Sequence, residues 1–164
     1  EDQLLKNIFI TAFFTGMRLN EILNMKWDWI NFSQDIITVK NSDDFKTKSK
    51  RERIIPIHQK VKSILLSYYP LGNQSKNDLI FYRKKNIKLN GEFMSKQFKE
   101  AVRAANLNDN IHFHNLRHSF ASNLVQRGAN LYTVQNLLGH ENFKTTQIYS
   151  HLNQGSLTNA VSLL

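Results

Sequence analysis

In the stretch Thr15-Gly16-Met17-Arg18-Leu19-Asn20-Glu21-Ile22-Leu23, the helical pattern of this chain is interrupted at Gly16. Apolar residues recur at helical spacing over residues 3–15 before it and over residues 19–27 after it. Arg18 and Glu21 are three residues apart, so on a helix they share a face. Taken alone, this spacing predicts only a surface ion pair, which contributes little to stability.

The apolar pattern then changes its period and predicts two short strands. Residues 35–39 (Asp-Ile-Ile-Thr-Val) and 53–57 (Arg-Ile-Ile-Pro-Ile) are rich in β-branched residues. We expect the lysine-rich segment between them to form the middle of a small sheet, with Pro56 on a strand edge. Further helices are predicted over residues 59–68, 92–105, 114–126, 131–138 and 142–149, and a short extended piece over 79–82. The predicted fold class is α+β: mostly α, with a small antiparallel three-stranded sheet near the N-terminal end.

Length and composition favour one domain that binds a polyanion. The chain has 164 residues, no cysteine and no apolar run of membrane-spanning length. We therefore expect a cytoplasmic protein without disulfides or thiolate metal sites. Its formal net charge is +9 and its pI is near 9.8. A surplus of this size indicates nucleic acid or an acidic membrane surface as the partner, without choosing between them.

The basic residues gather in two polar segments where loops or hairpin tips are expected. The first segment contains Lys46, Lys48, Lys50, Arg51 and Arg53. The second segment contains Arg83, Lys84, Lys85 and Lys88. Both clusters are either solvated loops or sites that bind DNA phosphates, since neutralising phosphates dominates DNA affinity.

Three more motifs carry residues suited to chemistry on an anion. In His114-Asn115-Leu116-Arg117-His118, both imidazoles and the guanidinium lie on one helical stripe and could hold an anion. Two histidines at this spacing could also bind a metal, but Arg117 would repel a cation. In Leu137-Leu138-Gly139-His140 the histidine either points into a cleft or caps a helix. Tyr149, in Thr145-Thr146-Gln147-Ile148-Tyr149-Ser150-His151, could be an ordinary amphipathic surface residue.

The order and spacing of these motifs resemble the tyrosine recombinases, which include phage integrases, transposon integrases and Xer-type chromosome resolvases. The matching residues occur in the order Arg18…Lys48…His114-x-x-Arg117…His140…Tyr149, and Tyr149 follows His140 by nine residues. The resemblance runs from about Leu4 to Tyr149 and implies the catalytic-domain fold of that family. Lys48 is identified by counting back from the Arg53-Ile54-Ile55-Pro56 strand, and Lys46 and Lys50 have similar chemistry.

The resemblance implies a DNA strand breakage and rejoining reaction. Tyr149 would attack the scissile phosphorus to give a 3′-phosphotyrosine and a free 5′-hydroxyl. Arg18 and Arg117 would stabilise the charge on the non-bridging oxygens without a metal or nucleotide cofactor. His114 would be the proton partner of Tyr149, and Lys48 would protonate the leaving 5′-oxygen.

Two other residues are given supporting roles by the same resemblance. His140 would donate a hydrogen bond to the phosphate, and Glu21 would orient Arg18 or the local helix. His118 and His151 are interpreted as structural. We expect Lys46, Lys50, Arg51, Arg53, Arg83, Lys84 and Lys85 to bind DNA.

The resemblance also implies a domain organisation and an assembly. Residues 1–164 are expected to form one catalytic domain, with a core over 1–151, a tail over 152–164 and no N-terminal DNA-clamping domain. The expected partner is double-stranded DNA in the bacterial cytoplasm and nucleoid. The tail would pack on a neighbouring subunit in a homotetramer on DNA, or fold back on its own domain. The alternatives are a DNA-binding module without activity, a type IB topoisomerase and, more distantly, a membrane-surface protein.

Overall fold

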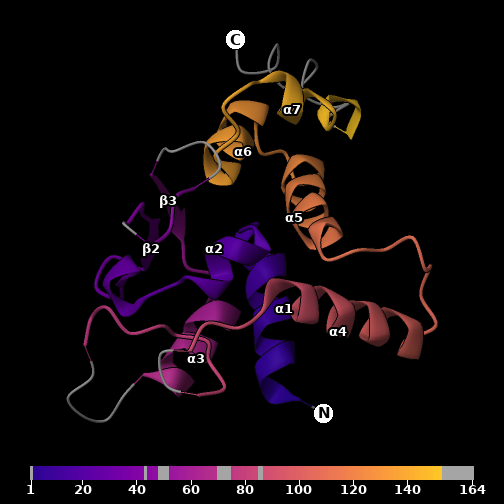
Figure 1. Cartoon of the computed structure of the whole chain (residues 1–164). Coiled ribbons are helices and arrows are strands. Elements are labelled where there is room, and N and C mark those ends of the chain that lie inside the picture. The colour runs from indigo at the N-terminus through magenta and orange to yellow at the C-terminus, as the bar shows by residue number, and fades with distance from the viewer. Residues whose placement is uncertain (1, 43, 48–51, 70–74, 85–86, 153–164) are drawn as a thin grey trace.

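A computed structural model describes residues 2–42, 44–47, 52–69, 75–84 and 87–152 (Figure 1). The helices are α1 (Gln3–Thr15), α2 (Leu19–Leu23), α3 (Gln59–Tyr68), α4 (Gly91–Ala104), α5 (His114–Gln126), α6 (Leu131–Leu138) and α7 (Lys144–Gln147). The 3₁₀ turns are η1 (Trp27–Trp29) and η2 (Ser150–Leu152), and the strands are β1 (Ile30–Asn31), β2 (Ile36–Val39) and β3 (Arg53–Pro56). The predicted fold class, mostly helical with a small antiparallel sheet, is confirmed.

Helix α1 is the central element and contacts α2, α3, α4 and α5 (Figure 1). Its buried face carries Ile8, Ala12 and Thr15, whose spacing of four and three residues follows the helical period. Asp2 caps its first turn by accepting hydrogen bonds from two backbone amides. Gly16 ends the helix in the left-handed conformation, with φ 63°. The chain therefore turns sharply just before Arg18.

The sheet differs from the prediction in its middle strand. Its order is β1-β2-β3, with both pairs antiparallel and Ile37 opposite Ile30 on one side and Ile55 on the other. The middle strand is therefore β2, and residues 44–47 of the lysine-rich segment are not in a strand. The segment was expected to pair because it joins two strands, but β1 occupies the free edge of β2. Pro56 lies in β3, an edge strand, as predicted.

Two predicted helices are shorter in the structure. The helix expected over residues 19–27 ends at Leu23, because the following backbone pairs with a distant segment. Met25 accepts a hydrogen bond from the Ile80 amide, and Lys26 forms a β-bridge with Leu79. The helix expected over 142–149 is reduced to α7, and Tyr149 follows it just before η2.

The apolar residues form two clusters that meet along α5. The larger cluster lies between α1, the sheet, α3 and α4, and includes Phe113 just before α5. The smaller cluster contains Ala121, Val125, Val134, Leu138 and Tyr149. Helix α5 therefore starts at the large cluster and ends in the small one. Across the described ranges, no helix is both long and apolar enough to span a membrane.

Candidate active site

Four of the six residues predicted to be catalytic line one pocket of about 360 Å³. Arg18 comes from the turn before α2, His114 and Arg117 from the first turn of α5, and His140 from the loop after α6. Gly139, Glu141, Asn142 and Thr145 complete the lining. Three segments that are far apart in sequence thus bring two guanidinium groups and two imidazole rings together. Among the described residues, no group of three or more His, Cys, Asp or Glu could hold a metal ion.

Arg117 is buried and held by two backbone carbonyls. Its Nη1 donates to the Gly16 oxygen at 2.6 Å and its Nη2 donates to the Leu138 oxygen at 2.6 Å. Burial lowers the pKa of Arg117 to about 9, and the positive charges of Arg18 and Arg53 add to that shift. A guanidinium with this pKa stays protonated at neutral pH, so the back of the pocket carries a fixed positive charge.

Arg18 is held by Glu21, which is buried and not at the surface as the spacing alone suggested. The Glu21 carboxylate accepts from the Arg18 backbone amide at 2.8 Å and from Arg18 Nη1 at 3.2 Å. The Arg18 side chain is 23 % exposed, so it can still reach a ligand. Burial alone would raise the pKa of Glu21, but hydrogen bonds and charge from Arg53 and Arg18 lower it overall. Glu21 is therefore a buried carboxylate at neutral pH.

The structure corrects the expectation that Arg53 binds DNA. Its side chain is only 6 % exposed and forms a two-bond pair with Glu21, at 3.0 Å and 2.6 Å. Its Nε donates to the Leu137 oxygen at 2.9 Å. Every nitrogen of the guanidinium therefore has a protein partner. The position of Arg53 in a run of basic residues suggested phosphate binding. The local sequence could not show that the Glu21 carboxylate lies beside it.

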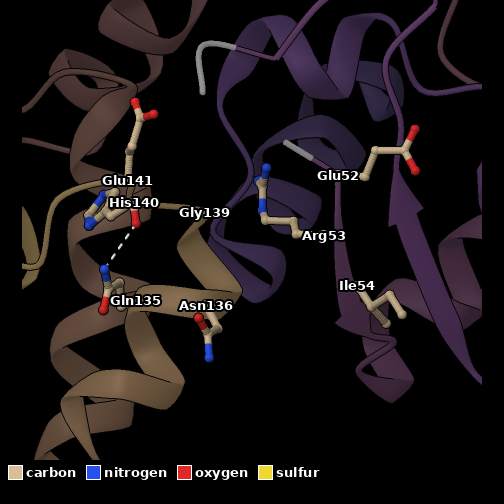
Figure 2. A pocket seen from close by; sticks show the side chains of 8 residues that line it. All are labelled: Glu52, Arg53, Ile54, Gln135, Asn136, Gly139, His140 and Glu141. Carbon is tan, nitrogen blue, oxygen red and sulfur yellow. Dashed lines mark hydrogen bonds between the residues drawn. The ribbon is translucent and has the colours of Figure 1, made fainter. Parts of the chain in front are cut away.

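A second pocket, of about 460 Å³, lies beside this ion pair (Figure 2). Figure 2 shows Glu52, Arg53 and Ile54 on one side, and Gln135, Asn136, Gly139 and His140 on the other. Gly139 has φ 65°, and a Cβ built there would lie 2.9 Å from the Arg53 Cδ. The glycine thus allows Arg53 to approach the turn that carries His140. Gln135 donates to the His140 carbonyl at 3.1 Å and steadies the same turn.

His140 is neutral at physiological pH. Burial lowers its pKa to about 4, and the positive charges of Arg117, Arg18 and Arg53 add to the shift. Its Nδ1 lies 2.9 Å from the hydroxyl oxygen of Thr146, which is itself buried. When Thr146 donates this bond, the other ring nitrogen carries a proton that can be donated into the pocket.

Tyr149 lies next to the pocket residues but does not line the pocket. Its side chain is packed in the small apolar cluster, with 5 % of the residue exposed. Its hydroxyl oxygen is 2.6 Å from His118 Nδ1. The sequence interpretation named His114 as the proton partner of Tyr149 and His118 as structural, and it did not anticipate this contact. The spacing of His114 and His118 placed both on one face of α5, but which of them meets Tyr149 depends on how α7 packs.

The remaining predicted residues are placed apart or lie outside the described ranges. Lys46 and Lys84 are exposed. Arg83 pairs with Asp2 and lies over the Phe93 ring, so it is at the opposite end of α1 from Arg18. Lys48, Lys50, Arg51, Lys85 and residues 153–164 of the tail lie outside the described residues.

Comparison with known proteins finds one family over most of the chain. A model of the phage integrase family matches residues 2–155. A tyrosine recombinase of Thermosipho africanus is 34 % identical over 159 residues, which cover 97 % of this chain and 53 % of that protein. Tyrosine recombinase XerC of Pediococcus pentosaceus is 36 % identical over 167 residues, covering 94 % of this chain and 52 % of XerC. The chain therefore spans about half the length of these curated relatives.

Solved structures of the same family share the fold. XerH recombinase bound to its difH substrate, before cleavage, superposes with a TM-score of 0.72 at 30 % identity, covering 96 % of this chain and 46 % of XerH. The catalytic domain of bacteriophage HP1 integrase superposes with a TM-score of 0.66 at 25 % identity, covering 97 % of this chain and 88 % of that domain. The pocket residues, the fold and these matches lead to one conclusion: the chain belongs to the phage integrase family of tyrosine recombinases.

Proposed function

We propose that this chain is the catalytic domain of a site-specific recombinase that cuts and rejoins DNA through a covalent 3′-phosphotyrosine at Tyr149. The observation that carries this proposal is the convergence of Arg18, His114, Arg117 and His140 on one pocket, with Tyr149 beside it. A phosphodiester placed there would meet two cations and two imidazoles. These groups suit a transition state with extra negative charge on the non-bridging oxygens.

Arg117 is prepared for such a ligand by its carbonyl contacts. A guanidinium has five N–H donors, and the Gly16 and Leu138 oxygens accept one from each terminal nitrogen. One donor on each terminal nitrogen and the Nε donor are left for a phosphate. Because the carbonyls fix the plane of the group, binding a phosphate costs little side-chain entropy. Arg18, oriented by Glu21, supplies the second cation.

The two remaining roles concern hydrogen bonding and proton supply. His140, neutral and oriented by Thr146, donates an N–H to a non-bridging oxygen. Lys48 protonates the leaving 5′-oxygen, a role proposed from the family resemblance alone. In the sequence Lys48 precedes Arg53, which is held in β3 by its ion pair with Glu21.

The proposed substrate is double-stranded DNA. The chain carries a net charge of +9, and XerH, which is 30 % identical, has been solved with its difH DNA substrate. The curated relatives are about twice as long as this chain. From the family resemblance alone, we propose that a DNA-clamping domain would act together with this one on the duplex. We also propose that the tail over residues 152–164 joins subunits in a homotetramer on DNA.

Covalent capture on a nicked suicide duplex tests the proposal. The duplex releases a short fragment after cleavage, so the protein remains attached to DNA and survives SDS. In excess EDTA, we expect an adduct with the wild-type chain and none with Tyr149→Phe, which lacks the nucleophilic oxygen. A Tyr149-independent adduct would contradict the assignment. If the wild-type chain, joined to a relative's DNA-clamping domain on that relative's site, still gives no adduct, the chain is a DNA-binding module without activity.

A further inference from the structure

The hydroxyl of the proposed nucleophile contacts a histidine that has no role in the mechanism above. We propose that His118 accepts the phenolic proton of Tyr149 during strand cleavage and returns it during rejoining. This inference rests on the proposed function of Tyr149. The main evidence is the distance of 2.6 Å between Tyr149 Oη and His118 Nδ1, which is well within hydrogen-bond range.

The surroundings of Tyr149 leave few routes for its proton. The residue is 5 % exposed and belongs to the small apolar cluster with Ala121, Val125, Val134 and Leu138, so water has little access to it. Burial raises the pKa of Tyr149, and the charge of Arg117 opposes this only in part. A preformed phenolate is therefore disfavoured. The phenol needs a base in contact with it when the O–P bond forms.

The other titratable groups around the site are engaged elsewhere. His140 Nδ1 is in contact with Thr146, and Arg117 has no acceptor atom. His114 lines the phosphate pocket, one helical turn before His118. The two imidazole rings touch edge to face with their centroids 4.9 Å apart. Helix α5 thus presents one histidine to the pocket and the next histidine to the phenol.

In the proposed step, His118 takes the proton that Tyr149 loses, and Lys48 supplies the proton that the 5′-oxygen gains. In the neutral tautomer with its proton on Nε2, His118 accepts at Nδ1 and the phenol donates. As the Tyr149 Oη–P bond forms and the P–O5′ bond breaks, the phenolic proton moves to His118 Nδ1. The 5′-oxygen takes a proton from the acid proposed to be Lys48. In rejoining, a 5′-hydroxyl attacks phosphorus, the phosphotyrosine bond breaks and His118 returns its proton to the tyrosine oxygen.

Single-turnover cleavage of the suicide duplex tests the role of His118. His118→Ala should cleave at least about 100-fold more slowly than wild type, because a positioned base commonly contributes about 10²–10⁴-fold. Its DNA affinity should be unchanged, because the side chain does not line the pocket. Added imidazole should restore cleavage by His118→Ala, with more basic imidazoles restoring more. His112→Ala is the matched control: this nearby histidine is exposed, and we expect wild-type cleavage without an imidazole response.

Two variants separate proton transfer from simple support of the phenol. His118→Gln keeps a hydrogen-bonding side chain but cannot accept a proton at neutral pH, so we expect it to be as slow as His118→Ala. Wild-type cleavage by His118→Gln would overturn the proposal, as would a folded His118→Ala that imidazole does not rescue. If His118→Ala does not fold by circular dichroism, His118→Gln alone decides. A wild-type chain that forms no adduct even when joined to a relative's DNA-clamping domain on that relative's site would instead refute the proposed function itself.

Discussion

Replacing Arg53 with methionine is expected to lower the free energy of unfolding by about 3 kcal/mol, the lower end of the range for breaking a buried ion pair. The substitution removes two bonds to Glu21 and one to the Leu137 carbonyl, and leaves a buried carboxylate. Arg18 remains as a partner for that carboxylate, which limits the loss. In a domain of this size such a loss corresponds to a fall in Tm of roughly 6–12 °C.

A double-mutant cycle isolates the ion pair from other effects of the substitution. Glu21→Leu should cost about 3–5 kcal/mol, since Arg53 then keeps only the Leu137 carbonyl. The double variant Glu21→Leu/Arg53→Met replaces both partners with apolar groups. Its loss should be smaller than the sum of the two single losses by about 2 kcal/mol or more.

Urea unfolding of the four proteins at pH 7 gives the cycle. The m-value should stay constant across the set, so that a shift in midpoint reports stability alone. The reasoning is refuted if Arg53→Met costs less than about 1 kcal/mol, or if the two single losses add to within about 0.5 kcal/mol. Either result would mean that the contact between β3 and α2 does not depend on this ion pair.

Three further predictions follow from other contacts of the site. Gly16→Ala should destabilise by at least about 1 kcal/mol more than Gly128→Ala in urea unfolding. Both glycines have positive φ, but only at Gly16 would a Cβ collide, 2.4 Å from a Phe120 ring carbon; equal losses would contradict this. Arg117→Lys should reduce adduct formation at least about 100-fold with little change in DNA affinity, because one ammonium cannot hold both carbonyls and a phosphate; a gel-shift assay beside covalent capture separates the two effects. The pKa of His140 is lowered to about 4 in the folded chain, so below about pH 6.5 the unfolded chain binds a proton at this residue that the folded chain does not. The free energy of unfolding of the wild type should therefore fall as the pH drops from about 6.5 toward 4. His140→Gln should lose stability less steeply over that range, and parallel curves would show that His140 does not cause the slope.

Elements whose signals are local were predictable from the sequence. The bounds predicted for α1, α3, α5 and α6 agree with the structure, because apolar periodicity and capping residues act within a turn or two of the helix. The end of α2 was not predictable, because Met25 and Lys26 pair with residues more than 50 positions away. Tertiary hydrogen bonds there replace the helical ones.

The candidate site was also predictable only in part. The order of the motifs identified Arg18, His114, Arg117 and His140, and the structure brings these four into one pocket. The sequence could not show that Arg53 pairs with Glu21, because 32 positions separate them. An arginine in a run of basic residues is equally expected to be exposed to solvent. Nor could it show which histidine of α5 meets Tyr149, because that depends on the packing of the small apolar cluster.

The carbonyl contacts of the two buried arginines also tie the site to the completion of folding. Arg117 reaches back 101 positions to Gly16 and forward 21 to Leu138, and Arg53 reaches forward 84 to Leu137. During synthesis neither arginine has its full set of partners until α6 has left the ribosome and docked. Contacts of such long range form late, because closing large loops costs entropy before the contact repays it. A nascent, truncated or partly melted chain would thus lack an assembled pocket.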